Sequence, residues 1–250
     1  MEPITSSLIV FAFVFGGALL GMFLHARLPP HHLSAESKSV VTLGVGLVGT
    51  MAALVLGLLI SSAKGYYDTQ NNELTQMSAN AILLDRTLAH YGPETAEARA
   101  ILRANVVRVL DQTWPKSAVY SPKAADPFEG ERIYSAIQGL TPKDDAQRAI
   151  KSQAFSIAVG LGSARWLMFE QTVNSIPSTM LVILVFWLTI IFLSFGLFAP
   201  ANATTVTSLF VSALTVSSAI FLILELFNPY QGLIRVPSAP LRVALERLGQ

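Results

Sequence analysis

The sequence predicts an all-α fold with four transmembrane helices and a helical cytoplasmic domain inserted between the second and third of these helices. Three observations predict it: an apolar composition, four uncharged stretches of spanning length, and no alternating pattern of the kind that β-strands show. Hydrophobic residues make up 52% of the 250 residues and charged residues 13%, at a mean hydropathy of +0.52. Because soluble domains carry about 25% charged residues, we expect the lipid bilayer to be the main partner of this chain.

Net charge and motif content exclude several classes of function. The formal net charge is +1, so no positive field attracts nucleic acid, and we expect no nucleic-acid partner. Cysteine is absent, which excludes disulfides, thiolate metal sites and cysteine nucleophiles. His31 and His32 are adjacent and follow two prolines, so we favour a solvated loop over a metal site. Since HExxH, Walker and GxSxG motifs are also lacking, we expect no enzyme, catalytic residue, metal or cofactor.

The apolar stretches define the spans, because a bilayer core of about 30 Å requires about 20 helical residues. The first stretch has no early Lys or Arg, so we expect it to remain as a span and not to be cleaved as a signal peptide. The tract 171–224 is free of charge and too long for one span, so it must fold back near Pro200. Pro177 suits a first helical position, with Asn174 or Ser175 as its cap. We place the spans at residues 4–24, 43–63, 177–198 and 205–227.

Basic residues close to the span ends predict the orientation. Arg27 and Lys38 lie in the loop between the first two spans, and the opposite side is richer in basic residues and should be cytoplasmic. The basic residues of that side are Lys64, Arg165, Arg235, Arg242 and Arg247. Both termini and the segment 65–176 are then expected inside the cell. The predicted domains are residues 1–64 (two spans and their outer loop), 65–176 (cytoplasmic helical domain), 177–230 (two further spans) and 231–250 (cytoplasmic tail).

The second span is expected to continue into the cytoplasm as one helix that ends at Gly92-Pro93. Its apolar positions repeat every seven residues and form a seam for another helix, either of the same chain or of a neighbouring subunit. The two registers of this seam are Tyr67, Leu74, Ala81, Leu88 and Gln70, Met77, Leu84, Tyr91. Further helices are predicted at 94–113, at 131–138 and from Pro142, which follows a capping-box residue at Thr141. Arg99, Arg103 and Arg108 fall off the apolar stripe of the first of these helices and are expected to be solvated.

Polar groups inside the last predicted span are candidates for a site. Ser208, Ser212 and Thr215, with three further hydroxyl residues, fall within about 140° of one another on an α-helix. This polar stripe can line a water path, but we favour the alternative in which each hydroxyl bonds a carbonyl one turn earlier. Glu225 is an ionisable residue embedded near the end of the span, and we favour a structural ion pair, with Lys64 as a partner, over a role in permeation.

The second predicted span contains Gly44, Gly46, Gly49 and Gly57, which favour close helix packing or the lining of a pore. Lys64 follows at its cytoplasmic end. This lysine is either an interfacial anchor whose ammonium reaches the headgroups or, in an oligomeric pore, part of a cationic ring that favours anions. The sequence leaves both interpretations open.

Several segments together are similar to a known family. They are residues 53–60 (ALVLGLLI), 84–88 (LDRTL), 91–94 (YGPE) and 224–232 (LELFNPYQG), the last followed by Pro240-Leu241. With these segments, nearly the whole chain resembles the bacterial bestrophin-like family, a domain of unknown function with four predicted spans. Tyr230 stands where Phe is more common in that family.

The resemblance extends to bestrophins, which are pentameric anion channels whose second helix lines the pore and narrows at a hydrophobic neck. It implies a bacterial inner (plasma) membrane protein that forms a homo-oligomer and passes small ions. The acidic calcium-clasp run of the animal channels is lacking, so calcium gating is not implied. We hypothesise an anion channel whose pore-lining candidates are Gly49, Val55, Leu58, Leu59 and Lys64. The alternative is a non-conducting membrane scaffold or sensor whose cytoplasmic helices bind a protein partner through the heptad seam.

Overall fold

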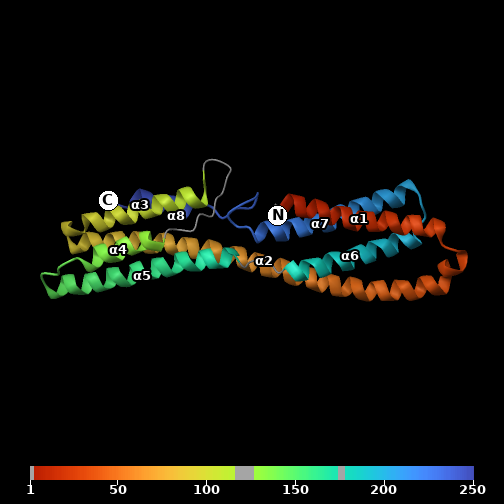
Figure 1. Cartoon of the computed structure of the whole chain (residues 1–250), viewed down its shortest axis with the longest axis horizontal. Helices are drawn as coiled ribbons and strands as arrows, with labels where there is room; N and C mark the ends of the chain where they lie inside the picture. Colours follow the sequence, from red (N-terminus) through yellow and green to blue (C-terminus); the bar gives the residue numbers. More distant parts are fainter. Residues whose placement is uncertain (1–2, 116–126, 174–177) are drawn as a thin grey trace. The chain divides into compact units, whose positions relative to one another are not determined.

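A computed structural model describes residues 3–115, 127–173 and 178–250 of the chain (Figure 1). These residues form helices joined by turns, and none of them lies in a β-strand, as predicted. The helices are α1 (Pro3–Arg27), α2 (Ala35–Tyr91), α3 (Ala96–Thr113), α4 (Pro127–Gln138), α5 (Asp145–Val173), α6 (Ser178–Phe198), α7 (Ala203–Leu226) and α8 (Ala239–Arg247), with short 3-10 turns at Pro30–Leu33 and Pro93–Thr95.

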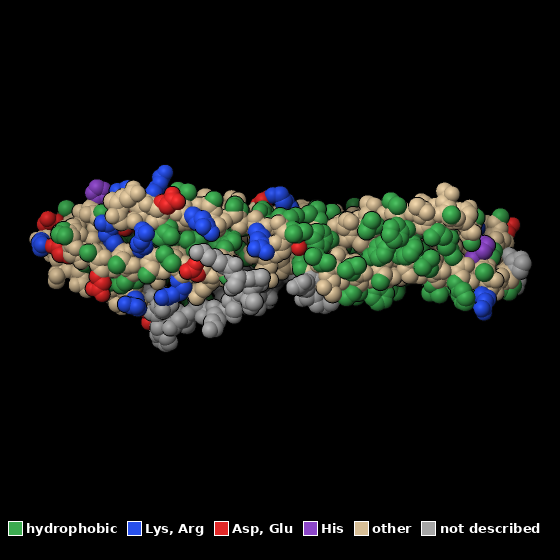
Figure 2. All heavy atoms as spheres, turned by 90° about the horizontal axis from the view of Figure 1, so that it is seen from above, with side chains coloured by type: hydrophobic (Ala, Val, Ile, Leu, Met, Phe, Trp, Pro, Cys, Tyr) green, Lys and Arg blue, Asp and Glu red, His purple; other side chains and the backbone are tan. Residues whose placement is uncertain are grey.

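The chain divides into two compact units. Unit 1 comprises Met1–Tyr66 and Ser175–Asn228, and unit 2 comprises Tyr67–Asn174 and Pro229–Gln250. Among the described residues, four helices are long and apolar enough to cross a membrane: α1, α2, α6 and α7. Hydrophobic side chains cover much of unit 1 in Figure 2, whereas Lys, Arg, Asp and Glu side chains gather over unit 2.

Within unit 1, α1 packs against α6 and α7. The contact between α1 and α6 brings backbone against backbone. A Cβ atom added at Gly21 would lie 2.0 Å from the carbonyl oxygen of Leu193, and one added at Gly196 would lie 1.9 Å from the carbonyl oxygen of Ala18. Only glycine fits at either position, which is how small residues let membrane helices approach.

The turn between α6 and α7 lies where the sequence predicts it. Helix α6 ends at Phe198, and α7 begins at Ala203, two residues before the predicted start. The side chain of Asn202 accepts a hydrogen bond from the backbone N–H of Thr205 at 2.8 Å and so caps α7. The predicted start of the third span at Pro177, with its cap at Asn174 or Ser175, lies outside the described residues.

Unit 2 is built around the half of α2 that follows Tyr67. Its heptad positions are buried in one hydrophobic core with residues of α3, α4, α5 and α8, and Leu74, Leu84 and Leu88 are fully buried. The predicted seam therefore exists, and helices of the same chain occupy it. Helix α2 ends at Tyr91 because Gly92 adopts a φ of 136°, which L-residues rarely adopt, and Pro93 follows.

The last helix of unit 2 that the sequence predicts begins later than expected. Helix α5 starts at Asp145, and the residue that caps it is Asp144, so the prediction of a start at Pro142 after Thr141 is wrong. The Asp144 carboxylate accepts a hydrogen bond from the Gln147 N–H at 2.7 Å, and the Gln147 side chain accepts one from the Lys143 N–H at 2.8 Å. This reciprocal pair satisfies two backbone donors at the start of α5 and so fixes where the helix begins.

Candidate functional site

The spanning part of α2 is the least covered of the four apolar helices. In its most apolar 18-residue window, 11% of the residues are buried, against 28% in α1, 28% in α6 and 44% in α7. Helix α2 therefore presents most of its apolar surface outside its own chain. A single apolar helix surface of this kind is covered by lipid or by another protein chain.

The predicted pore-lining residues do not share one face of α2. Leu59 is 2% exposed and lies on the buried face with Ala52 and Ala63, so it points into its own chain and we no longer consider it a pore-lining candidate. Its neighbour Leu58 is 59% exposed. Gly49 and Val55 are half-buried, and Lys64 is exposed.

The outward face of α2 carries a row of large apolar side chains spaced three or four residues apart. This row, here called the leucine stripe, consists of Leu43, Leu47, Met51, Leu54 and Leu58, and all its members are exposed. Leu54, at 75% exposed, is the most open of them. Leu54 is not among the pore-lining candidates predicted from the sequence, although the three-four spacing of the stripe is a signal that could have identified it.

A second row beside the leucine stripe consists of small and polar residues. At about 100° per residue, its members fall within about 60° of one another on α2. This row, here called the small-residue strip, consists of Gly46, Thr50, Gly57, Ser61 and Lys64, and all its members are exposed. Apart from Lys64, the residues of the strip have small side chains, and Thr50 and Ser61 carry hydroxyl groups. This face of α2 therefore suits close approach by another chain or contact with water.

The glycines of α2 differ from those of α1 and α6. A Cβ atom added at Gly44, Gly46, Gly49, Gly57 or Gly65 would meet no described atom of the chain within 4 Å. Glycine inside a helix costs about 1 kcal/mol relative to alanine. At Gly21 and Gly196 the backbone contact explains that cost, whereas in α2 nothing in the described part of the chain does.

Helix α7 places its predicted hydroxyl stripe on the outside of the chain. Ser208, Ser212 and Thr215 are exposed. The Thr215 hydroxyl donates to the carbonyl of Val211 at 2.9 Å, and the Ser218 hydroxyl donates to that of Leu214 at 2.8 Å. At these two positions the hydroxyls bond their own helix, in line with the favoured interpretation, and a water path along the stripe remains a prediction.

Glu225 is buried at the end of α7, together with its helical neighbours Leu224 and Leu226. Beside it, the ring of Phe227 packs against Tyr66 of α2 with centroids 5.8 Å apart. The ion pair between Glu225 and Lys64 stays a prediction.

The segment after α7 is held to α2 by buried polar contacts within unit 2. The Tyr230 hydroxyl donates to the side-chain oxygen of Gln70 at 2.9 Å, and Gln70 is fully buried. The Trp114 ring lies edge-on to Tyr230, with centroids 5.8 Å apart, and its indole N–H donates to the carbonyl of Val236 at 3.0 Å. The phenol of Tyr230 is thus the group that satisfies the Gln70 oxygen, a contact that phenylalanine would not make.

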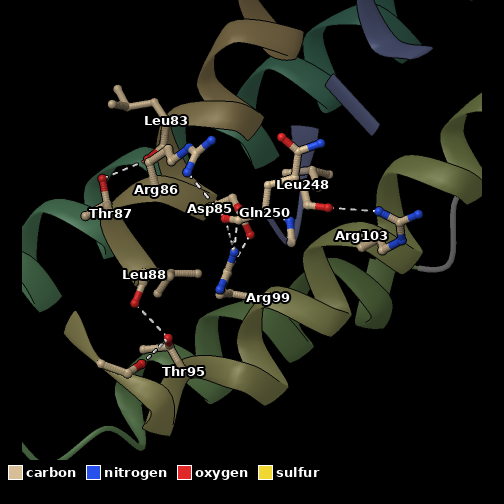
Figure 3. A network of polar contacts seen from close by, with 12 residues as sticks. Leu83, Asp85, Arg86, Thr87, Leu88, Thr95, Arg99, Arg103, Leu248 and Gln250 are labelled. Atoms are coloured by element: carbon tan, nitrogen blue, oxygen red, sulfur yellow. Dashed lines mark hydrogen bonds and ion pairs between the residues drawn. The ribbon is translucent and has the colours of Figure 1, made fainter. Parts of the chain in front are cut away.

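The LDRTL segment of α2 is the centre of an arginine network (Figure 3). Arg99 of α3 binds both oxygens of Asp85, at 2.8 and 2.9 Å, and the N–H of Gly249 donates to the second oxygen at 3.2 Å. Burial raises the pKa of Asp85, but the hydrogen bonds from Arg99 and Gly249 and the charge of Arg99 outweigh it and hold the pKa below its ordinary value. Arg86 and Arg99 each donate to the carbonyl of Gln250 at 3.3 Å.

Arg103 continues this network by donating to the carbonyls of Leu245 and Leu248, at 3.0 and 2.9 Å. The prediction that Arg99 is solvated is therefore wrong, because its guanidinium is partly buried against Asp85. Arg103 is exposed, as predicted, but it also binds the end of α8 and the residue that follows it. The network fixes that segment against α2 and α3, which is a structural role. In the described residues, no group of three His, Asp or Glu side chains is placed to hold a metal ion.

The apolar helices and the exposed faces of α2 define an all-helical membrane protein. Residues 12–241 match the Bestrophin-like domain, so the chain belongs to the bestrophin-like family. In the solved structures, it is similar to a single-site mutant of a bacterial bestrophin homologue from Klebsiella pneumoniae, with a TM-score of 0.67 and 15% identity over 96% of this chain and 97% of that one. At this identity the likeness shows the fold. None of the curated proteins matches the chain.

Proposed function

We propose that this protein is a homo-oligomeric channel for small anions in a bacterial inner membrane, with α2 of each subunit lining the pore. The observation that carries this proposal is the apolar part of α2, which is largely uncovered in the single chain and contains four glycines, Gly44, Gly46, Gly49 and Gly57, at which an added Cβ atom would meet no described atom within 4 Å. In an oligomer arranged around a central axis, other subunits and the pore border this part of α2. Close approach of the subunits then accounts for glycine at these positions. Family membership supports the same arrangement.

In this arrangement the four apolar helices span the bilayer, and unit 2 and both termini lie in the cytoplasm. The small side chains of the strip leave space for a water-filled path, and its hydroxyl groups can bond the water. Leu54 and Leu58 form an apolar constriction that gates by excluding water, and Lys64 forms a cationic ring at the inner end that favours anions. Exposure of Lys64 is compatible with this role.

The test is ion flux from liposomes that contain the purified protein, together with the mass of the detergent-solubilised particle. We expect an oligomer and chloride flux, with faster flux in Leu58→Ala because a smaller side chain lets water into the constriction. The matched control is Leu8→Ala on α1, since Leu8 is 61% exposed and Leu58 is 59% exposed. A monomeric particle, or liposomes that remain impermeable to chloride, would refute the proposal.

A second pair of variants tests the selectivity. Lys64→Gln should lower the preference for chloride over sodium, whereas Lys38→Gln at the opposite end of the spanning part of α2 should leave it nearly unchanged. Equal selectivity in the two variants would remove Lys64 from the mechanism.

The alternative, a non-conducting scaffold or sensor, rested on a heptad seam that another protein could occupy. That seam is buried in the core of unit 2 against helices of its own chain. The seam therefore no longer favours the scaffold hypothesis, and the channel is the function that we propose.

A further inference from the structure

Unit 2 contains an apolar cavity of about 80 Å³ among its helices. Most of its lining is hydrophobic, and the residues come from α2, α3, α4, α5 and α8. The principal apolar residues are Met77, Leu102, Val106, Val109, Leu161 and Leu241. Three polar residues join them: Asn105, Tyr134 and Arg165.

Arg165 is a cation in an unfavourable place. It is half-buried, and the positive charge of Arg108 acts on it. Burial, and then Arg108, lower the pKa of the Arg165 guanidinium, which means that the charged form is destabilised there. In the described part of the chain no carboxylate pairs with Arg165. A half-buried charge without an opposite charge is costly, and an anion bound beside it would offset that cost.

The other two polar residues are suited to the same anion. Asn105 carries an amide donor. Burial raises the pKa of Tyr134, so its phenol stays protonated and can donate a hydrogen bond. Gly162 leaves the space for this phenol, because a Cβ atom added there would lie 1.8 Å from the Tyr134 hydroxyl oxygen. Three donors and no acceptor-only side chain thus line one apolar cavity.

We propose that this cavity binds a short-chain monocarboxylate, with the carboxylate at Arg165 and the alkyl group among the apolar side chains. The volume sets the size of the alkyl group, because a cavity of about 150 Å³ accepts benzene and this one has about half that volume. A chain of three or four carbons fits, as in butanoate or pentanoate. The site lies in unit 2, and its existence does not depend on ion conduction through α2.

The test is isothermal titration of the full-length protein in detergent with butanoate, acetate and 1-butanol. Butanoate carries both an alkyl group and a charge, acetate keeps the charge with almost no alkyl group, and 1-butanol keeps the alkyl group without the charge. We expect butanoate to bind at least tenfold more tightly than either of the others. Equal binding of all three compounds, or no binding of butanoate, would overturn the proposal.

Variants locate the site. Arg165→Gln should weaken butanoate binding at least tenfold, whereas Arg148→Gln, which removes an exposed arginine of the same helix, should leave it unchanged. Val109→Phe should abolish binding by filling the cavity while Arg165 is kept, and its circular dichroism spectrum checks that it has folded. If Val109→Phe does not fold, Leu161→Phe replaces it. Butanoate binding that survives both Arg165→Gln and cavity filling would place the ligand elsewhere and overturn the proposal. Chloride flux is not used, so failure here leaves the channel proposal unaffected.

Discussion

Removal of the Asp85 carboxylate should lower the free energy of unfolding of unit 2, and the burial and hydrogen bonds of this side chain determine by how much. The Asp85 side chain is 1% exposed and receives three hydrogen bonds, two from Arg99 and one from Gly249. Breaking a buried ion pair by removing one partner costs about 3–5 kcal/mol, because the other charge is left unpaired. Since Arg99 is 23% exposed and regains some water, we expect the lower end, about 3 kcal/mol, for Asp85→Ala.

Thermal unfolding in detergent, followed by tryptophan fluorescence, measures this effect, and Trp114 lies in the core of unit 2. In a chain of this size, 1 kcal/mol shifts Tm by about 2–4 °C, so Asp85→Ala should lower Tm by about 6–12 °C. The control is Asp145→Ala, whose ion pair with Arg148 is exposed on both sides and should matter little.

A double variant separates the ion pair from other effects of the substitution. If the pair is the main contact of both side chains, Asp85→Ala combined with Arg99→Ala should lower Tm by clearly less than the sum of the two single shifts. Equal Tm values for Asp85→Ala and Asp145→Ala, or fully additive shifts in the double variant, would refute the reasoning.

Three further predictions follow from contacts described above. The pKa of Asp85 in the folded protein lies below its unfolded value of about 3.9. The contribution of this carboxylate to stability is therefore present above pH 4 and is lost as the pH falls through the folded pKa. Between pH 7 and pH 3, Tm should fall more steeply in the wild type than in Asp85→Asn. Tyr230→Phe leaves the Gln70 oxygen without this donor and should cost about 1–3 kcal/mol, seen as a lower Tm in the same assay. Gly21→Ala should prevent the close approach of α1 to α6 and lower Tm sharply. Gly57→Ala should leave Tm unchanged and alter only the mass of the solubilised particle or the chloride flux. Equal Tm values for the two variants would contradict the conclusion that Gly21 faces a backbone contact inside the chain and Gly57 does not.

The helices themselves could be predicted from the sequence, because their signals are local. Uncharged stretches of about 20 residues indicate the apolar helices, and Gly92-Pro93 ends α2 where the backbone requires it. The heptad positions of α2 after Tyr67 are buried as predicted. Polar residues occupy the positions between them, so the pattern distinguishes the buried face of the helix from its solvent-facing side.

The directions of side chains in the spanning part of α2 could not be predicted in the same way. That stretch is apolar on all sides, so periodicity does not distinguish Leu58, which is exposed, from Leu59, which is buried. The roles of Arg99 and Arg103 were missed for a different reason. Their partners lie in the C-terminal segment, about 150 positions away in the sequence, and no local pattern reports such a contact.

The contact between α1 and α6 also has a consequence for sequence variation among relatives. At Gly21 and Gly196 the opposing atoms belong to the main chain, so no smaller neighbour can compensate for an added side chain. Any relative that keeps this helix crossing is therefore expected to retain both glycines, whatever its function. Under the proposed arrangement, in which α2 meets other subunits, variation at Gly46 and Gly57 should instead follow differences in that contact, so the two pairs of positions should vary independently among relatives.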